Sequence, residues 1–439
     1  MYKAIDTGYV ALFNELLDAG GDVDCIFVDE ANISTKSLLH ICCEKGQLGC
    51  VQTLIDRGAY LSARDNWGQT PLMFSVLADR KDVAEMLLTH QPSLISDSDK
   101  YGESCLHFAA NNGMLEFMNI LFKYGAVPDK ANQSGYTPLM TSILSRDIEN
   151  SRLRCDVIKL LIAHGSNYEM REPRGKRSSL QLAVLAKDAD VVEVLLQAGA
   201  DPNSLDRGGR TALTNCLLEN IIVPREPGSM PIIDDNIQSM IILLTQAGTN
   251  MNLSLCEYSH PLICVSFVGS LQLVQFFMEN GSLPDLSSNC FPSGVTPILT
   301  AASRNQITIV KHFLSWGCCF NEKGRISRKQ TDYSFDCFEL AIFLKYWDLA
   351  KLLLKVGYHW KPNQIDKDED LRESLETSEE MTEWYNSFVR TPQSLMFYSI
   401  RTIRESLGSN IPSKYKKLEL PKSINDQILL KDLLSLEES

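Results

Sequence analysis

The feature that most constrains this chain is a short segment that returns at an almost fixed spacing between residues 16 and 357. Each copy is rich in leucine and ends in glycine, as in "LIDRG" at Gly58, "LFKYG" at Gly125 and "LLKVG" at Gly357. In "LLTHQ" the glycine position holds Gln91, and the steps from Gly58 to Gln91 to Gly125 are 33 and 34 residues. A period of this length indicates a repeat protein, in which units that cannot bury their own apolar faces stack into a solenoid.

A second motif opens the units, as in "GQTPLM" at Gly68, "GYTPLM" at Gly135 and "GVTPIL" at Gly294. Threonine can cap the free amides at the start of a helix, and proline in the first turn already has a helical φ and needs no donor. The later glycine ends the second helix because it adopts the left-handed conformation without a steric penalty. The sequence therefore predicts an all-α fold in which short hairpins join pairs of helices.

These residues resemble the ankyrin repeat, and their spacing indicates about ten units between Met1 and about Asn363. The resemblance implies an array that binds other proteins and catalyses no reaction, so we expect no catalytic residue. His40 and His107 stand where the family motif "TPLH" has histidine. We expect both to have a structural hydrogen-bonding role.

Composition and charge exclude several classes of function. The chain is 44% apolar and 22% charged, which is typical of a globular protein with a large core. Its net charge is −13, the wrong sign for binding nucleic acid. No apolar run approaches the roughly 18 residues of a spanning helix, and the first residues lack the pattern of a secretory signal. We therefore expect no membrane association and a location in the cytoplasm, with the nucleus as a second compartment.

Motifs for metals and cofactors are missing from the sequence. The 13 cysteines contain no CxxC pair, the histidines show no metal-ligand spacing with them, and no GxGxxG or P-loop pattern occurs. We expect the cysteines to be small buried apolar residues, and we expect no metal and no cofactor.

Hairpin tips and insertions are the places where one repeat of an array differs from the next. Trp67, Tyr101, Tyr136 and Arg210 lie at hairpin tips and are residue types that often anchor interfaces, so we expect them to contact a protein substrate. Alternatively, an aromatic residue beside the turn glycine only braces the next hairpin. Extra residues enter near 145–155 and 219–235, between the first and second helix of a unit, where they form either functional loops or tolerated surface loops.

The repeat pattern fades near residue 360, and the composition then changes. Residues 366–383 carry nine acids against Lys367 and Arg372, a net charge of −7. We interpret residues 364–389 as an acidic linker, which is a solvated helix or an extended connection.

A last amphipathic helix is predicted after this linker. Pro392 follows Thr391 as a helix start, and Gly408 is a helix stop. Leu395, Ser399, Ile403 and Leu407 recur at intervals of four and form one stripe, whereas Arg401 lies off it. Such a helix either caps the stack or docks into a groove of another protein.

The stripe resembles the elongin-binding box, in which an aliphatic residue, a small residue and a second aliphatic residue follow at intervals of four. Ser394, Leu395, Ser399 and Ile403 match this pattern, although Ser399 stands where cysteine is commonest. The resemblance implies that these residues bind elongin C, which travels with elongin B.

The following segment, "LELPKSINDQILL", is similar to the cullin-contacting half of a SOCS box. The matching residues, which the resemblance implies are cullin-binding, are Leu418, Leu420, Pro421 and Ile424. Glu419 replaces the first proline of the turn and Gln427 replaces a usual aromatic residue.

The order of these segments makes the chain similar to ankyrin-repeat and SOCS-box proteins. The expected domains are an ankyrin array over 1–363, the linker over 364–389 and a SOCS box over 390–433, with its elongin-binding helix at 391–408 and its cullin-box-like segment at 415–432. The family implies a receptor that brings an unidentified protein substrate to an elongin B/C, cullin-5 and RING-protein ubiquitin ligase. A plain ankyrin scaffold whose C-terminal helices cap the stack, and an enzyme, are the alternatives.

Overall fold

The computed structural model describes residues 2–28, 35–221, 233–253, 260–284, 294–328, 331–356 and 368–390. The chain divides into two compact units, residues 1–207 and residues 208–439. We describe each unit by itself.

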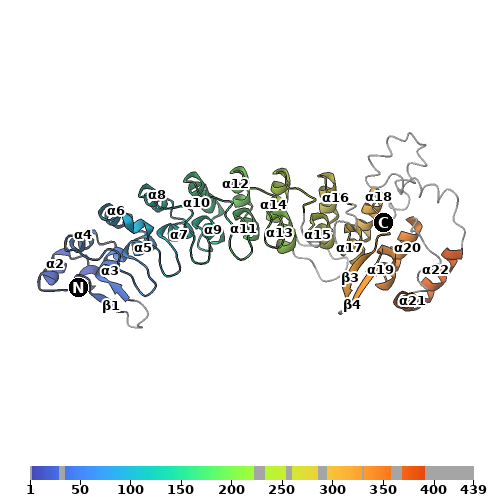
Figure 1. The fold of residues 1–439 in the computed structure, drawn as a ribbon, viewed down its shortest axis with the longest axis horizontal. Helices are drawn as coiled ribbons and strands as arrows, with labels where there is room; N and C mark the ends of the chain where they lie inside the picture. The colour runs from blue at the N-terminus through green and yellow to red at the C-terminus, as the bar shows by residue number, and fades with distance from the viewer. Residues whose placement is uncertain are drawn as a thin grey trace. The chain divides into compact units, whose positions relative to one another are not determined.

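The first unit consists of helix pairs whose members form two rows (Figure 1). In one row each helix packs on the next, from α3 (Leu38–Lys45) through α5 (Pro71–Leu77), α7 (Cys105–Asn111) and α9 (Pro138–Leu144) to α11 (Ser179–Leu185). The second row contains α2 (Val10–Asp18), α4 (Leu48–Asp56), α6 (Lys81–His90), α8 (Leu115–Lys123), α10 (Ser151–Ala163) and α12 (Ala189–Gln197). A short helix α1 (Tyr2–Asp6) and an antiparallel hairpin of β1 (Ile26–Val28) and β2 (Thr35–Ser37) complete the N-terminal part, with Ile26 opposite Ser37.

The core of this unit runs between the two rows. Phe13 on α2 and Phe117 on α8 are fully buried, as are leucines from every helix pair. Because each pair buries its apolar side chains against the next, the core continues from pair to pair, as a solenoid requires.

The helix starts and stops agree with the sequence analysis. The side chains of Thr70 and Thr137 accept hydrogen bonds from the amides of Met73 and Met140, three residues into α5 and α9. The predicted stop glycines that the structure describes have positive φ, for example +79° at Gly58. Where Gln91 replaces glycine, φ is −139° and a 3₁₀ turn, η1 (Pro92–Ser96), follows instead.

The second unit repeats the helix pair. Its helices are α13 (Ala212–Asn215), a π-helical turn η2 (Cys216–Asn220), α14 (Asp235–Gln246), α15 (Pro261–Val268), α16 (Leu271–Glu279), α17 (Pro297–Ser303), α18 (Ile307–Trp316), α19 (Cys337–Phe343) and α20 (Trp347–Val356). Strands β3 (Gly324–Arg328) and β4 (Thr331–Phe335) form an antiparallel hairpin with Gly324 opposite Phe335. The number of repeats stays a prediction.

The segment interpreted as an acidic linker contains two helices. These are α21 (Glu369–Glu376), which packs on α19, and α22 (Glu379–Arg390), which packs on α21. Leu371, Leu375, Met381 and Tyr385 are buried, so the described part of this segment is a folded cap and not an extended connection. The acids that dominate its composition lie mostly on the exposed face of the same helices.

The insertion at 145–155 enters between α9 and α10, as predicted, and part of it extends α10 to 13 residues. Arg154 holds it in place: its guanidinium lies 2.5 Å from the Asp188 carboxylate and donates to the carbonyl of Ile148. Of the insertion at 219–235, residues 222–232 lie outside the described residues.

Candidate protein-binding surface

The hairpin tips of the first unit share one turn that is held by a polar side chain. One carboxylate oxygen of Asp65 accepts from the amides of Trp67 (2.9 Å) and Gln69 (2.7 Å). Asp99 does the same for Tyr101 and Glu103, both at 2.8 Å. These bonds stabilise the turn from within and leave the side chains at its apex free to face outward.

Successive tips are joined by main-chain hydrogen bonds. The amide of Lys100 donates to the carbonyl of Trp67 (2.9 Å), and the amide of Gln133 donates to that of Tyr101 (2.8 Å). Further along, the amide of Arg207 donates to the carbonyl of Gly175 (2.6 Å). We call the row formed by residues 65–69, 99–103, 132–136, 172–177 and 205–207 the tip ridge.

Glycine in the tips permits this close approach. Gly102 has φ +80°, and a Cβ there would lie 2.7 Å from the amide nitrogen of Gln133. At Gly135 a Cβ would lie 2.1 Å from Cγ of Pro173 in the next tip. The turn glycines therefore serve both the left-handed backbone and the contact between tips.

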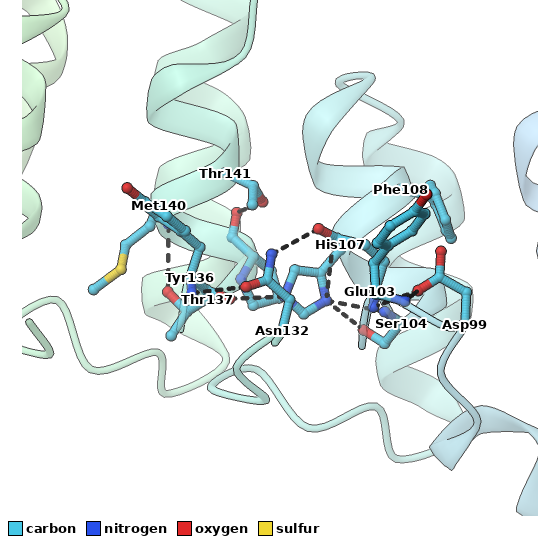
Figure 2. Close-up of polar contacts among 12 residues, drawn as sticks. Asp99, Glu103, Ser104, His107, Phe108, Asn132, Tyr136, Thr137, Met140 and Thr141 are labelled. Atoms are coloured by element: carbon cyan, nitrogen blue, oxygen red, sulfur yellow. Dashed lines mark hydrogen bonds and ion pairs between the residues drawn. The ribbon is translucent and has the colours of Figure 1, made fainter. Parts of the chain in front are cut away.

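His107 ties the tips to the helices beneath them (Figure 2). Its Nδ1 accepts from the Ser104 amide (3.1 Å) and lies 2.8 Å from the Ser104 hydroxyl, and its Nε2 lies 3.1 Å from the carbonyl oxygen of Tyr136 in the following tip. This pattern requires the proton on Nε2. His40 makes the same bridge from Ser37 to the Gln69 carbonyl, and Gln181 makes it from Ser178 to the Ser204 carbonyl with its amide group. The predicted structural role of both histidines is confirmed.

The His107 ring is neutral in this arrangement. Only 1% of the residue is exposed, and burial lowers the pKa of His107 to about 4. The Glu103 carboxylate lies 3.8 Å from Nδ1, and burial raises the pKa of Glu103. Because Nδ1 already accepts a hydrogen bond from the Ser104 amide, we interpret this proximity as a packing contact and not as an ion pair at neutral pH.

Two of the four predicted substrate contacts, Trp67 and Tyr101, lie side by side on the tip ridge. They are 38% and 51% exposed, and their rings stack with centroids 6.3 Å apart. The Lys100 ammonium lies 3.5 Å from the centroid of the Trp67 ring. Trp67 therefore braces the next tip, as the alternative interpretation proposed, and the pair still presents aromatic surface to solvent.

Tyr136 and Arg210, the other two predicted substrate contacts, are only partly exposed to solvent. Tyr136 is half-buried. Arg210 belongs to the second unit, is also half-buried, and forms an ion pair with Glu219 at 3.0 Å. Whether any of the four residues contacts a substrate stays a prediction.

The sequence analysis missed the tip at 171–177, which is basic. Glu172, only 2% exposed, accepts from the amides of Arg174 (2.8 Å) and Gly175 (2.6 Å) and so replaces the aspartate of the other tips. Arg174 and Lys176 project from it and are exposed. The sequence feature that indicates this basic tip is the cluster of arginine and lysine in "REPRGKR".

The predicted elongin- and cullin-binding residues cannot be placed. Ser394, Leu395, Ser399 and Ile403 lie outside the described residues, as do the residues of the cullin-box-like segment, Leu418, Leu420, Pro421 and Ile424.

Among the described residues, no group of three or more histidine, cysteine or acidic side chains could hold a metal ion. No helix in the same part of the chain is long and apolar enough to cross a membrane. Burial raises the pKa of Cys105 and Cys264 to about 12, so these two side chains are thiols at neutral pH.

Comparison with known proteins identifies the repeats of the first unit. A family model of three ankyrin repeats matches residues 1–97 and 90–172, and a single-repeat ankyrin model matches residues 176–207. The ankyrin repeat domain of Bcl-3 aligns with a TM-score of 0.46 at 22% identity, over 56% of this chain and 98% of that one.

Curated relatives match at low identity. The human transient receptor potential cation channel subfamily A member 1 is 23% identical over 57% of this chain and 24% of its own length. The E3 ubiquitin-protein ligase KEG of Arabidopsis thaliana is 24% identical over 60% of this chain and 18% of its own length. The chain thus spans less than a quarter of the length of both. The putative ankyrin repeat protein YahD of Escherichia coli is 28% identical over 35% of this chain and 75% of its own length. The family models thus support ankyrin repeats over residues 1–172 and 176–207.

Proposed function

We propose that this chain is the substrate-recognition subunit of a ubiquitin ligase of the elongin B/C and cullin-5 type. In this proposal the ankyrin array holds the protein to be ubiquitinated, residues 391–408 bind elongin C, and residues 415–432 contact the cullin. Ankyrin repeats imply protein–protein interaction, and the exposed aromatic and basic side chains of the tip ridge are consistent with that role.

The observation that carries the proposal is the cap formed by α21 and α22. Leu371 and Leu375 of α21 are buried, and α21 packs on α19 of the last helix pair. Lys351 on α20 forms an ion pair with Glu380 on α22 at 3.1 Å, which fixes the second cap helix to the same pair. These residues already close the described end of the stack.

The cap helps to distinguish the receptor from a plain scaffold. In the scaffold alternative, the amphipathic stripe at 391–408 would itself cover the end of the helix stack. Because residues 368–390 already cover the last helix pair, the stripe is left for another partner, and its pattern resembles an elongin-binding box. This supports the receptor over the scaffold.

The chain would act by proximity and would contribute no chemistry of its own. Holding a substrate beside a ubiquitin carrier on the same scaffold raises the effective concentration of its lysines at the carrier. The relatives include a cation channel and a ubiquitin ligase, so the repeats alone do not select this function.

Leu395→Asp tests the proposal directly. A charge at the first position of the stripe should abolish capture of elongin C from a co-expression lysate, because burying an unpaired carboxylate is costly. Arg401→Asp is the matched control: it adds the same residue to the same segment but off the stripe, and should leave capture within about twofold. Undiminished elongin C with Leu395→Asp would reject the proposal.

A further inference from the structure

The tip at 171–177 is basic, whereas the chain as a whole is acidic. Residues 171–177 contain four basic side chains and one carboxylate, a net charge of +3, in a chain whose net charge is −13. The carboxylate of Glu172 is buried and accepts hydrogen bonds from the backbone amides of the turn.

The tip has a longer turn than its neighbours. In the first two tips the closing main-chain bonds join Asp65 to Gln69 and Asp99 to Glu103, which leaves three residues between the partners. Here the amide of Glu172 donates to the carbonyl of Arg177 (3.0 Å), which leaves four. Glutamate is one methylene longer than aspartate, and it reaches the amides of this wider turn. The additional residue allows both Arg174 and Lys176 to be exposed at the apex.

The adjoining tip, residues 205–207, carries the cation Arg207 next to Asp206 in the sequence. The Arg207 amide donates to the Gly175 carbonyl, so the exposed Arg207 stands next to the basic turn. Arg171 crosses between the two tips, donating to the carbonyl of Leu205 and to the hydroxyl of Ser204 (2.9 Å). Arg171 forms no ion pair within the described residues, although the Ser204 hydroxyl also donates to the carboxylate of Glu169 (3.5 Å).

These cations have no partner of opposite charge within the described residues. Arg174, Lys176, Arg177 and Arg207 form no ion pair there. By contrast, other basic residues of the first unit do pair, for example Lys81 with Glu116 and Lys123 with Glu85. Positive charges that lie close together without counter-charges repel one another, and an anionic ligand lowers this repulsion.

From this arrangement we infer that the basic tip, formed by Arg171, Arg174, Lys176, Arg177 and Arg207, recognises an acidic segment of the protein that the ankyrin array binds. The ligand chemistry is that of carboxylate or phosphate groups on an extended peptide, since guanidinium groups pair with both. The inference deepens the proposed function and rests on it for the role of the bound protein as a substrate.

The first experiment measures binding of the full-length chain to three pools of short random-sequence peptides that differ only in being rich in glutamate, phosphoserine or lysine. We expect the glutamate or the phosphoserine pool to bind about tenfold more tightly than the lysine pool at low salt, and the difference to shrink as salt rises. A stronger phosphoserine signal would indicate a phosphorylated segment, and equal signals a carboxylate-rich one; both support the inference. Equal binding of the acidic and basic pools would overturn it.

Charge reversal of the tip is the second experiment. Arg174→Glu with Arg207→Glu should lower binding of the acidic pools by about tenfold. Arg152→Glu with Lys159→Glu on α10 is the control, because both residues are exposed and the change in net charge is the same; it should stay within about twofold. An equal loss in the control would mean a general effect of net charge, and tighter binding of RNA than of the acidic pools would assign the tip to nucleic acid; either result overturns the inference. If the reversed variant does not fold, the double alanine variant is used with the same criteria.

Failure here is distinguishable from failure of the proposed function. Elongin C capture depends on residues 391–408, so it should be unchanged by Arg174→Glu with Arg207→Glu. Loss of peptide preference with intact capture would reject only the basic tip.

Discussion

The aromatic tips and the basic tip of the first unit are both built on a turn held by a carboxylate, and they present different chemistry. Around Trp67 and Tyr101 an aspartate holds the turn and two stacked rings face outward. Around Arg174 and Lys176 a glutamate holds a longer turn and cations face outward. The comparison shows that the residues that shape a tip and the residues that it exposes are separate sets, which lets a repeat array vary its binding surface while keeping its fold.

The largest loss of stability should come from changing a residue that shapes a tip. Gly102→Ala strains a left-handed backbone and places a Cβ 2.7 Å from the Gln133 amide nitrogen, so we expect a loss of about 3 kcal/mol in the free energy of unfolding. Gly125→Ala is the control, since Gly125 has φ +86° but no atom within 4 Å of its added Cβ, and it should cost about 1 kcal/mol. Urea titrations measure both. Equal losses would mean that contact between tips contributes nothing.

A smaller, pH-dependent effect is expected at His107, which joins two tips. Burial is the main cause that lowers the pKa of His107 to about 4, with Lys130 lowering it further and the Tyr136 carbonyl and Asp99 opposing. The unfolded chain binds a proton on this ring below about pH 6.5, whereas the folded chain does so only near pH 4. Stability is therefore greatest above pH 6.5 and falls as the pH drops from 6.5 to 4, by about 2 kcal/mol at pH 5 from this ring alone.

His107→Gln tests that effect, because Gln181 makes the same bridge with an amide that does not titrate. The variant should match the wild type within about 1 kcal/mol at pH 7.5 and lose less stability between pH 6.5 and pH 5. Parallel curves for the two proteins would show that His107 is not the titrating group.

The smallest loss of stability should come from changing a residue that a tip exposes to solvent. Trp67→Ala removes a stacked, partly exposed ring, and we expect it to cost less than about 1 kcal/mol in the free energy of unfolding. The same change should weaken capture of the bound protein by more than about fivefold if Trp67 anchors the interface. Unchanged capture would leave Trp67 with the bracing role alone.

Much of the fold could be read from the sequence because its signals are local. The glycine stops, the Thr-Pro starts and the bridging histidines each act within a few residues of their own position, and the structure confirms them. The bonds between tips could not be read, because they join main-chain groups some 33 residues apart that no residue type specifies.

The packing of the cap at 368–390 and the basic tip were not predicted from the sequence, for different reasons. Nine acids dominated the composition of the cap segment, although Leu371 with Leu375 and Met381 with Tyr385 keep the four-residue spacing of a buried helical face. The basic tip does not follow the pattern of the other tips, because in "RGKRS" the serine comes three residues after the glycine, whereas in "GQT", "GES", "GYT" and "GRT" the hydroxyl residue comes two residues after it.

The central claim is that residues 391–433 serve a foreign partner while the array keeps its own fold. It is tested most directly by co-expressing the full-length chain with elongins B and C and measuring the mass of the purified species by light scattering. The account predicts one stable complex that contains a single copy of each of the three chains. A monodisperse chain that elutes without the elongins would contradict it.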